Sequence, residues 1–154
     1  MKAKTMVMTL AFCFVAGAMG FASDVNVGTW KLNEAKSKFA PGTPKNTTVV
    51  YEAAGDDVKV TIDGTGNDGN PTHNEWTGKF DGKDYPVTGD PNSDARSLTK
   101  IDDHTLAFKV KKDGKVTISG RIVVSADGKS RTVTTSGTDS KGTKVKSTAV
   151  YDKQ

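Results

Sequence analysis

Alternation of apolar and polar residues between residues 105 and 151 is the feature that most constrains how this chain can fold. In residues 105–112 and 116–124 apolar side chains recur at every second position, with Thr, Ser, Lys or Arg between them. A two-residue period is that of a β-strand with one buried and one exposed face. The breaks contain Asp113-Gly114 and Asp127-Gly128, and Asp-Gly pairs tolerate the positive φ of tight hairpin turns. This stretch therefore predicts an antiparallel meander.

The chain before this stretch repeats the pattern in shorter runs. Alternating segments are expected at residues 27–32, 48–53, 58–62, 74–80, 85–87 and 95–101, although the sequence does not show which face of 95–101 points inward. Two prolines and a glycine in residues 33–46 argue against a long helix there and make it the longest predicted connection. We expect an all-β fold: a single antiparallel up-and-down barrel of about ten strands, eight at the fewest, because closure removes exposed sheet edges.

Residues 1–22 have the layout of a secretory signal peptide. Lys2 and Lys4 precede an apolar run at residues 6–18, and Ala22 provides a small residue for cleavage. The run is too short for a membrane-spanning helix, which needs about 20 residues. We expect cleavage near Ala22, a periplasmic or secreted protein that does not span the membrane, and a barrel domain at residues 23–154.

Charge and composition limit the expected partners. The formal charge is +4, and removal of residues 1–22 takes away two lysines and no acidic residue. A nearly balanced, dispersed charge gives no reason to expect a nucleic acid partner. The single cysteine, Cys13, is lost with the signal peptide, and His73 and His104 lack the spacing of a metal site. The Gly- and Asn-rich residues 63–69 fit a flexible loop better than a calcium loop. We expect a monomer without metal or cofactor.

A Gly-x-Trp motif stands at the first predicted strand as Gly28-Thr29-Trp30, and Val150-Tyr151 lies at the end of the last one. With the Asp-Gly hairpins between them, these motifs resemble the calycin group, meaning the lipocalins and the cytosolic fatty-acid-binding proteins. The chain also resembles bacterial exported lipocalin-like proteins of unassigned function. The resemblance implies a calycin-like barrel in which Gly28 and Trp30 are structural and the interior binds a small molecule.

Two departures separate the chain from the fatty-acid-binding branch. Residues 33–46 are too few for the helical pair that forms the portal in that branch, so we expect no portal helices. That branch also carries an arginine two residues before the tyrosine of its last strand, which holds a ligand carboxylate. The matching position here is Ala149, so the resemblance carries over Tyr151 alone.

Side chains expected on the inner face are the candidate ligand contacts. Arg131 shares the parity of Val133, so its guanidinium pairs with an acidic side chain, binds an anionic ligand head or reaches solvent at the barrel rim. Aromatic rings on that face either line a cavity or fill the core. Gly78, Gly120, Ser147 and Ala149 lack bulk, which favours a residual cavity. The candidate ligand-binding residues are Arg131, Tyr151, Trp76, Tyr85, Phe108 and Tyr51.

These observations predict an exported β-barrel that binds a small hydrophobic or amphiphilic ligand in its interior. No Ser-His-acid set or paired carboxylate motif is recognisable, so we do not expect an enzyme. Two alternatives stay open: a ligand-free structural or protein-interaction module of the cell envelope, and an enzyme acting on an apolar ligand.

Overall fold

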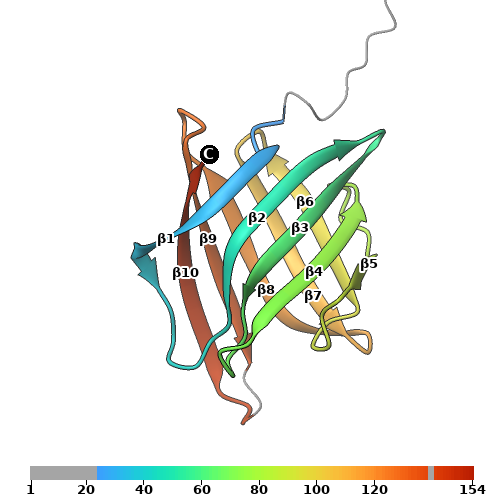
Figure 1. The fold of residues 1–154 in the computed structure, drawn as a ribbon. Coiled ribbons are helices and arrows are strands. Elements are labelled where there is room, and N and C mark those ends of the chain that lie inside the picture. Colours follow the sequence, from blue (N-terminus) through green and yellow to red (C-terminus); the bar gives the residue numbers. More distant parts are fainter. Residues whose placement is uncertain (1–23, 139–140) are drawn as a thin grey trace, which may run out of the picture.

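The computed structural model describes residues 24–138 and 141–154 and shows a closed antiparallel barrel (Figure 1). Each strand pairs with its neighbours in sequence, and the first pairs with the last, which closes the sheet. This confirms the predicted all-β barrel; the predicted signal peptide at residues 1–22 lies outside the described residues. The strands are β1 (Gly28–Lys38), β2 (Lys45–Ala54), β3 (Asp57–Thr65), β4 (Pro71–Gly78), β5 (Tyr85–Thr88), β6 (Ala95–Asp102), β7 (Thr105–Lys112), β8 (Lys115–Val124), β9 (Ser130–Thr138) and β10 (Lys144–Lys153).

The predicted meander corresponds to β7–β10, and its first turn has the expected geometry. Asp113 and Gly114 have φ values of 50° and 76°, and Lys112 pairs with Lys115 across the turn. Two successive positive φ values are those of a type I′ hairpin, whose twist matches that of the flanking strands. The Asp-Gly pair therefore sets the register next to the turn, and the register shifts by one residue between Lys111 and Val110, as at a β-bulge.

Alternation along the strands places most of the apolar residues in the barrel core, whereas Val116 and Ile118, in the regularly alternating stretch, are 50% and 39% exposed. Trp30, Trp76, Leu98 and Leu106 are each no more than 2% exposed. They lie on four different strands, so the core is shared around the whole barrel. None of the described residues belongs to a helix long and apolar enough to cross a membrane.

The first strand is longer than the sequence predicted. We expected it to end near residue 32, but β1 runs on to Lys38, and the connection to β2 is residues 39–44. The pairing of β1 with β10 shifts register between Asn33 and Lys38, as at a β-bulge. The irregular pairing explains why the alternation stops while the strand continues.

The two ends of the barrel differ. At one end the first described residues lie close to the C-terminus (Figure 1), and the indole Nε1 of Trp30 donates a hydrogen bond to the Asn26 carbonyl at 2.8 Å. Val25 packs against the core there and helps to close this end. The other end carries the β1–β2, β3–β4 and β5–β6 connections, which surround an opening into the interior.

Candidate functional site

A cavity of about 570 Å³ lies inside the barrel and opens among the β1–β2, β3–β4 and β5–β6 connections. The wall within the strands carries many aliphatic side chains, whereas the connections at the mouth contribute mainly polar ones, among them the carboxylates of Asp68 and Asp90. This size and mixture are typical of sites for small molecules. The apolar wall includes Val49, Val60, Ile62, Leu98, Val110, Ile122 and Val133, and the polar lining includes Asn46, Asn74, Arg96, Arg131, Thr135, Ser147 and Tyr151.

Arg131 lies at the closed end of the barrel among three aromatic rings. Its guanidinium carbon is 4.7 Å from the ring centroid of Trp30, 4.9 Å from Tyr51 and 5.0 Å from Tyr151. The residue is 3% exposed, so it does not reach solvent at the rim. Its Nε and Nη1 have no hydrogen-bond partner among the described residues. The electron-rich ring faces therefore stabilise this buried charge where a carboxylate would otherwise be needed.

The hydroxyl of Tyr151 forms a hydrogen bond within the barrel wall. The hydroxyl donates a hydrogen bond to the Asn46 carbonyl at 2.9 Å, and the residue is 4% exposed. Burial raises the pKa of Tyr151 to about 12, although the nearby charge of Arg131 acts in the opposite direction. Tyr151 is therefore a neutral donor that ties β10 to β2.

Arg96 on β6 is a second cation of the cavity lining, and the sequence interpretation did not select it. Its Nη2 donates to Asn74 Oδ1 at 3.3 Å, and its backbone carbonyl accepts a hydrogen bond from Trp76 Nε1 at 2.9 Å. Burial lowers the pKa of Arg96, while Tyr51 and Asp90 act in the opposite direction. Within the described ranges, no carboxylate forms an ion pair with this guanidinium.

The alternation of side chains along β6 contained information on Arg96, but it was ambiguous. Arg96 is two residues before Leu98, so the two side chains share a face. Polar residues occupy both faces of this strand, however, and Ser97 on the other face is only 5% exposed. The alternation therefore did not distinguish the inner face of β6 from the outer one.

The remaining predicted contacts divide into two groups. Tyr51 and Phe108 line the cavity, whereas Trp76 and Tyr85 are not part of its lining. The rings of Trp76 and Tyr85 pack edge to face, with centroids 5.7 Å apart and planes at 85°. The Tyr85 hydroxyl donates a hydrogen bond to Asp81 Oδ2 at 2.8 Å on the exposed side of the ring. The ring of Tyr85 therefore packs beside the core while its hydroxyl points to solvent.

The small interior residues also have two different roles. A Cβ added at Gly78 would lie 2.5 Å from the Tyr85 ring, and one added at Gly120 would lie 2.7 Å from the Phe108 ring. The expectation that these glycines leave open space is wrong, since aromatic rings occupy it. Ser147 and Ala149 do line the cavity.

No protein-family model matches the chain, and neither does any curated protein. Functional inference therefore depends on the residues of the barrel and their surroundings.

One polar cluster lies on β3 and β4 at the cavity mouth, whose lining includes His73. His73 Nδ1 is 2.6 Å from Asp63 Oδ1, and its Nε2 is 3.7 Å from Glu75 Oε1. The hydrogen bond with Asp63 raises the pKa of His73. Across residues 24–138 and 141–154, no group of three or more His, Cys, Asp or Glu side chains has the arrangement of a metal site.

Proposed function

We propose that this barrel binds a small amphiphilic molecule in its interior, with an acidic head group on Arg96 and an apolar body against the aliphatic wall. The observation that carries the proposal is a cavity of about 570 Å³ whose lining combines this wall with a partly buried arginine that forms no ion pair with a carboxylate among the described residues. Arginine keeps its charge, and burying a charge without a partner is costly. A ligand carboxylate or sulfonate would relieve that cost.

Arg96 is a better anchor than Arg131 because of what surrounds each guanidinium. The Nε and Nη1 atoms of Arg131 have no exposed surface, and three rings surround the group. A ligand would have to displace those rings to reach these two atoms. Among the residues that the structure describes, the Arg96 guanidinium hydrogen bonds with Asn74 alone, which leaves donors for a bidentate contact with an acid.

The layout of residues 1–22 supports a location outside the cytoplasm, which we include in the proposal. The closed barrel with Gly28-x-Trp30 near its closed end also supports the calycin-like assignment. A binding protein of this kind would protect an amphiphile from water while it crosses an aqueous compartment.

The test is a titration of purified protein that has first been stripped with organic solvent. Palmitate and its neutral alcohol analogue, hexadecanol, would compete against a fluorescent apolar probe. We expect both to bind, and Arg96→Gln to weaken palmitate about tenfold or more while changing hexadecanol little, because a hydrogen bond to a charged group contributes about 1.5–3 kcal/mol. Lys31→Gln, which removes an exposed cation of β1 outside the cavity lining, is the control.

Two results would contradict the proposal in different ways. If neither compound nor the probe binds the stripped protein, the interior is not a ligand site. If both bind and Arg96→Gln leaves palmitate unaffected, the cavity is a ligand site but the head group is not at Arg96.

A further inference from the structure

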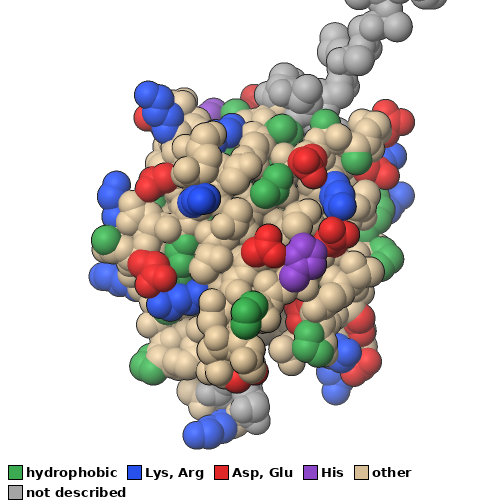
Figure 2. Space-filling model, in the orientation of Figure 1, with side chains coloured by type: hydrophobic (Ala, Val, Ile, Leu, Met, Phe, Trp, Pro, Cys, Tyr) green, Lys and Arg blue, Asp and Glu red, His purple; other side chains and the backbone are tan. Residues whose placement is uncertain are grey.

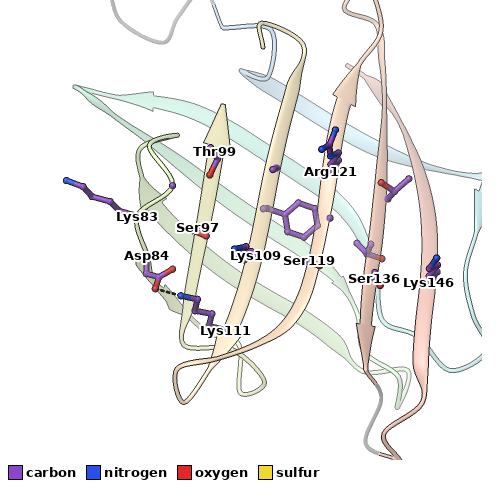
Figure 3. Close-up of a pocket in the computed structure, with 16 residues that line it drawn as sticks. Lys83, Asp84, Ser97, Thr99, Lys109, Lys111, Ser119, Arg121, Ser136 and Lys146 are labelled. Carbon is purple, nitrogen blue, oxygen red and sulfur yellow. Dashed lines mark hydrogen bonds and ion pairs between the residues drawn. The ribbon is translucent and has the colours of Figure 1, made fainter. Parts of the chain in front are cut away.

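A second cavity, of about 760 Å³, lies on the outside of the barrel (Figure 3). Its floor is the outer face of β6–β9, the segment at residues 82–84 forms one rim, and Lys146 on β10 forms the other. This groove lies on the other face of the sheet from the interior site, because most of its polar side chains have the opposite parity to Leu98, Val110 and Ile122. Phe108 and Thr135 line both cavities.

The strand register explains why the outer face is hollow here. A row of paired residues crosses five strands in the order Ser97, Lys109, Ser119, Ser136 and Lys146. Short serine side chains lie between long lysines, so the floor is low where the serines are. In the adjoining row Ala107 and Thr134 flank Arg121 in the same way.

The groove is strongly cationic. Its lining contains Lys83, Lys109, Lys111, Arg121 and Lys146 but a single carboxylate, that of Asp84. Lys111 Nζ pairs with Asp84 at 2.6 Å, as the dashed line in Figure 3 shows. In the part of the chain that the structure describes, no ion pair involves the exposed cations Lys109, Arg121 and Lys146.

The opposite side of the barrel has a different charge pattern. Figure 2 shows acidic and basic side chains interspersed on that side. Lys59 pairs there with Glu75 at 3.2 Å, and His73 pairs with Asp63. The small net charge of the chain therefore conceals a local excess of cations on the outer face of β6–β10.

The lining indicates the chemistry of a partner. Its accessible groups are ammonium, guanidinium and hydroxyl groups, and its one aromatic residue, Phe108, packs against the core and over Gly120. Single-stranded nucleic acids depend on exposed rings for stacking, which this groove does not offer. A concave floor also suits a chain better than the flat surface of a bilayer. Sugar hydroxyls and acidic substituents match hydroxyl and cationic side chains.

We propose that this outer groove binds an anionic polysaccharide chain through its carboxylate or sulfate groups. Lys109, Arg121 and Lys146 contact the acidic substituents, and Ser97, Ser119 and Ser136 lie between them to hydrogen bond with the sugar. These six side chains belong to the groove lining and not to the lining of the interior cavity.

The test is binding of a heparin octasaccharide and of an oligogalacturonate to the purified protein. We expect the triple variant Lys109→Gln, Arg121→Gln, Lys146→Gln to weaken at least one of them about tenfold or more. The control variant Lys31→Gln, Lys36→Gln, Lys59→Gln removes the same charge from β1 and β3 and should change affinity about twofold at most. Binding should weaken as salt rises, because salt screens exposed charges.

Several outcomes would overturn the proposal. Equal losses in the two triple variants would mean that net charge alone attracts the polyanion, and no binding of either saccharide would remove the site. Tighter, groove-dependent binding of an oligo-dT strand or of anionic phospholipid vesicles would assign the groove to a different partner.

Unchanged binding of the fluorescent interior probe by the groove variant would show that the variant is folded and that the two sites are separate. The single reversal Arg121→Glu repeats the test with less risk to folding.

Discussion

At the scale of single residues, Arg131 and Tyr151 show how burial changes the chemistry of a side chain. The guanidinium of Arg131 lies among three rings, which places a cationic group at the closed end of the barrel. That charge favours ionised Tyr151, yet the pKa of Tyr151 is raised because burial is the larger effect. Tyr151 is therefore the group through which this end of the barrel responds to alkaline pH.

We predict that Tyr151 makes the barrel less stable above about pH 10. The folded state keeps the phenol protonated up to a pKa of about 12, whereas the unfolded chain releases the proton near pH 10. The unfolded state therefore binds fewer protons in this interval, and the free energy of unfolding falls as pH rises. The stabilisation is fully present below about pH 10, and about 2–3 kcal/mol is lost by about pH 12.

The measurement compares wild type with Tyr151→Phe in urea between about pH 7 and pH 11. At neutral pH wild type should be more stable by about 1 kcal/mol, because the variant loses the hydrogen bond to the Asn46 carbonyl. Phe does not titrate, so this advantage should shrink above about pH 10 and then reverse. A difference that stays constant across the range would show that Tyr151 is not the titrating group.

At the scale of strands, the sequence predicted most where alternation is regular and turns are explicit. β7 and β8 have both features, and their bounds and hairpin follow directly from them. β1 was predicted too short because its second half pairs irregularly with β10, and the inner face of β6 was not assigned because both faces are polar. Glycines within strands were misinterpreted as open space, although their role depends on rings from neighbouring strands.

Gly120 gives a direct test of that last point. A Cβ at this position would lie 2.1 Å from the Thr134 carbonyl oxygen on β9 and 2.7 Å from the Phe108 ring. The carbonyl belongs to the sheet and cannot move without disturbing the β8–β9 pairing. We predict that Gly120→Ala lowers the free energy of unfolding by about 2–3 kcal/mol, the range of an overpacked core, as measured by chemical denaturation.

Gly137→Ala is the matched control on the next strand. A Cβ there would lie 3.0 Å from the Thr117 carbonyl oxygen and 3.2 Å from the Ile118 side chain, so a smaller shift would accommodate it. Its loss of stability should be clearly smaller than that of Gly120→Ala. An equal or greater loss for Gly137→Ala would indicate that replacing glycine by alanine in a strand lowers the stability by itself. Contact of the new Cβ with Thr134 and Phe108 would then not be the cause.

At the scale of the whole molecule, pairing between strands brings the side chains of each candidate site together. The rings around Arg131 come from β1, β2 and β10, which become neighbours because β1 pairs with both β2 and β10. The outer groove likewise needs rows that cross five strands. Periodicity within one strand assigned Arg131 and Tyr151 to the inner face, but it contained no information on these partners. The sequence therefore predicted which side chains face the interior, but it did not predict which of them contact one another across strands.

The β1–β10 seam completes the barrel, and its irregular part depends on one side chain. Where the register shifts, Ser37 Oγ accepts a hydrogen bond from the Val150 amide at 2.9 Å and donates to the Asn33 carbonyl at 2.7 Å. We predict that Ser37→Ala lowers the free energy of unfolding by about 1 kcal/mol, a typical loss for one hydrogen bond. Hydrogen exchange should locate the effect, with faster exchange of the Val150 amide.

Ser136→Ala, on the outer face of β9 where the pairing is regular, is the control for this seam. It should leave exchange of the Val150 amide unchanged. If Ser37→Ala also leaves that amide protected, then the backbone pairing of β1 with β10 is sufficient to close the barrel. If protection is lost at Val150 and retained in β7 and β8, the barrel opens first at the seam, because local opening exposes the least stable pairing before the rest of the sheet.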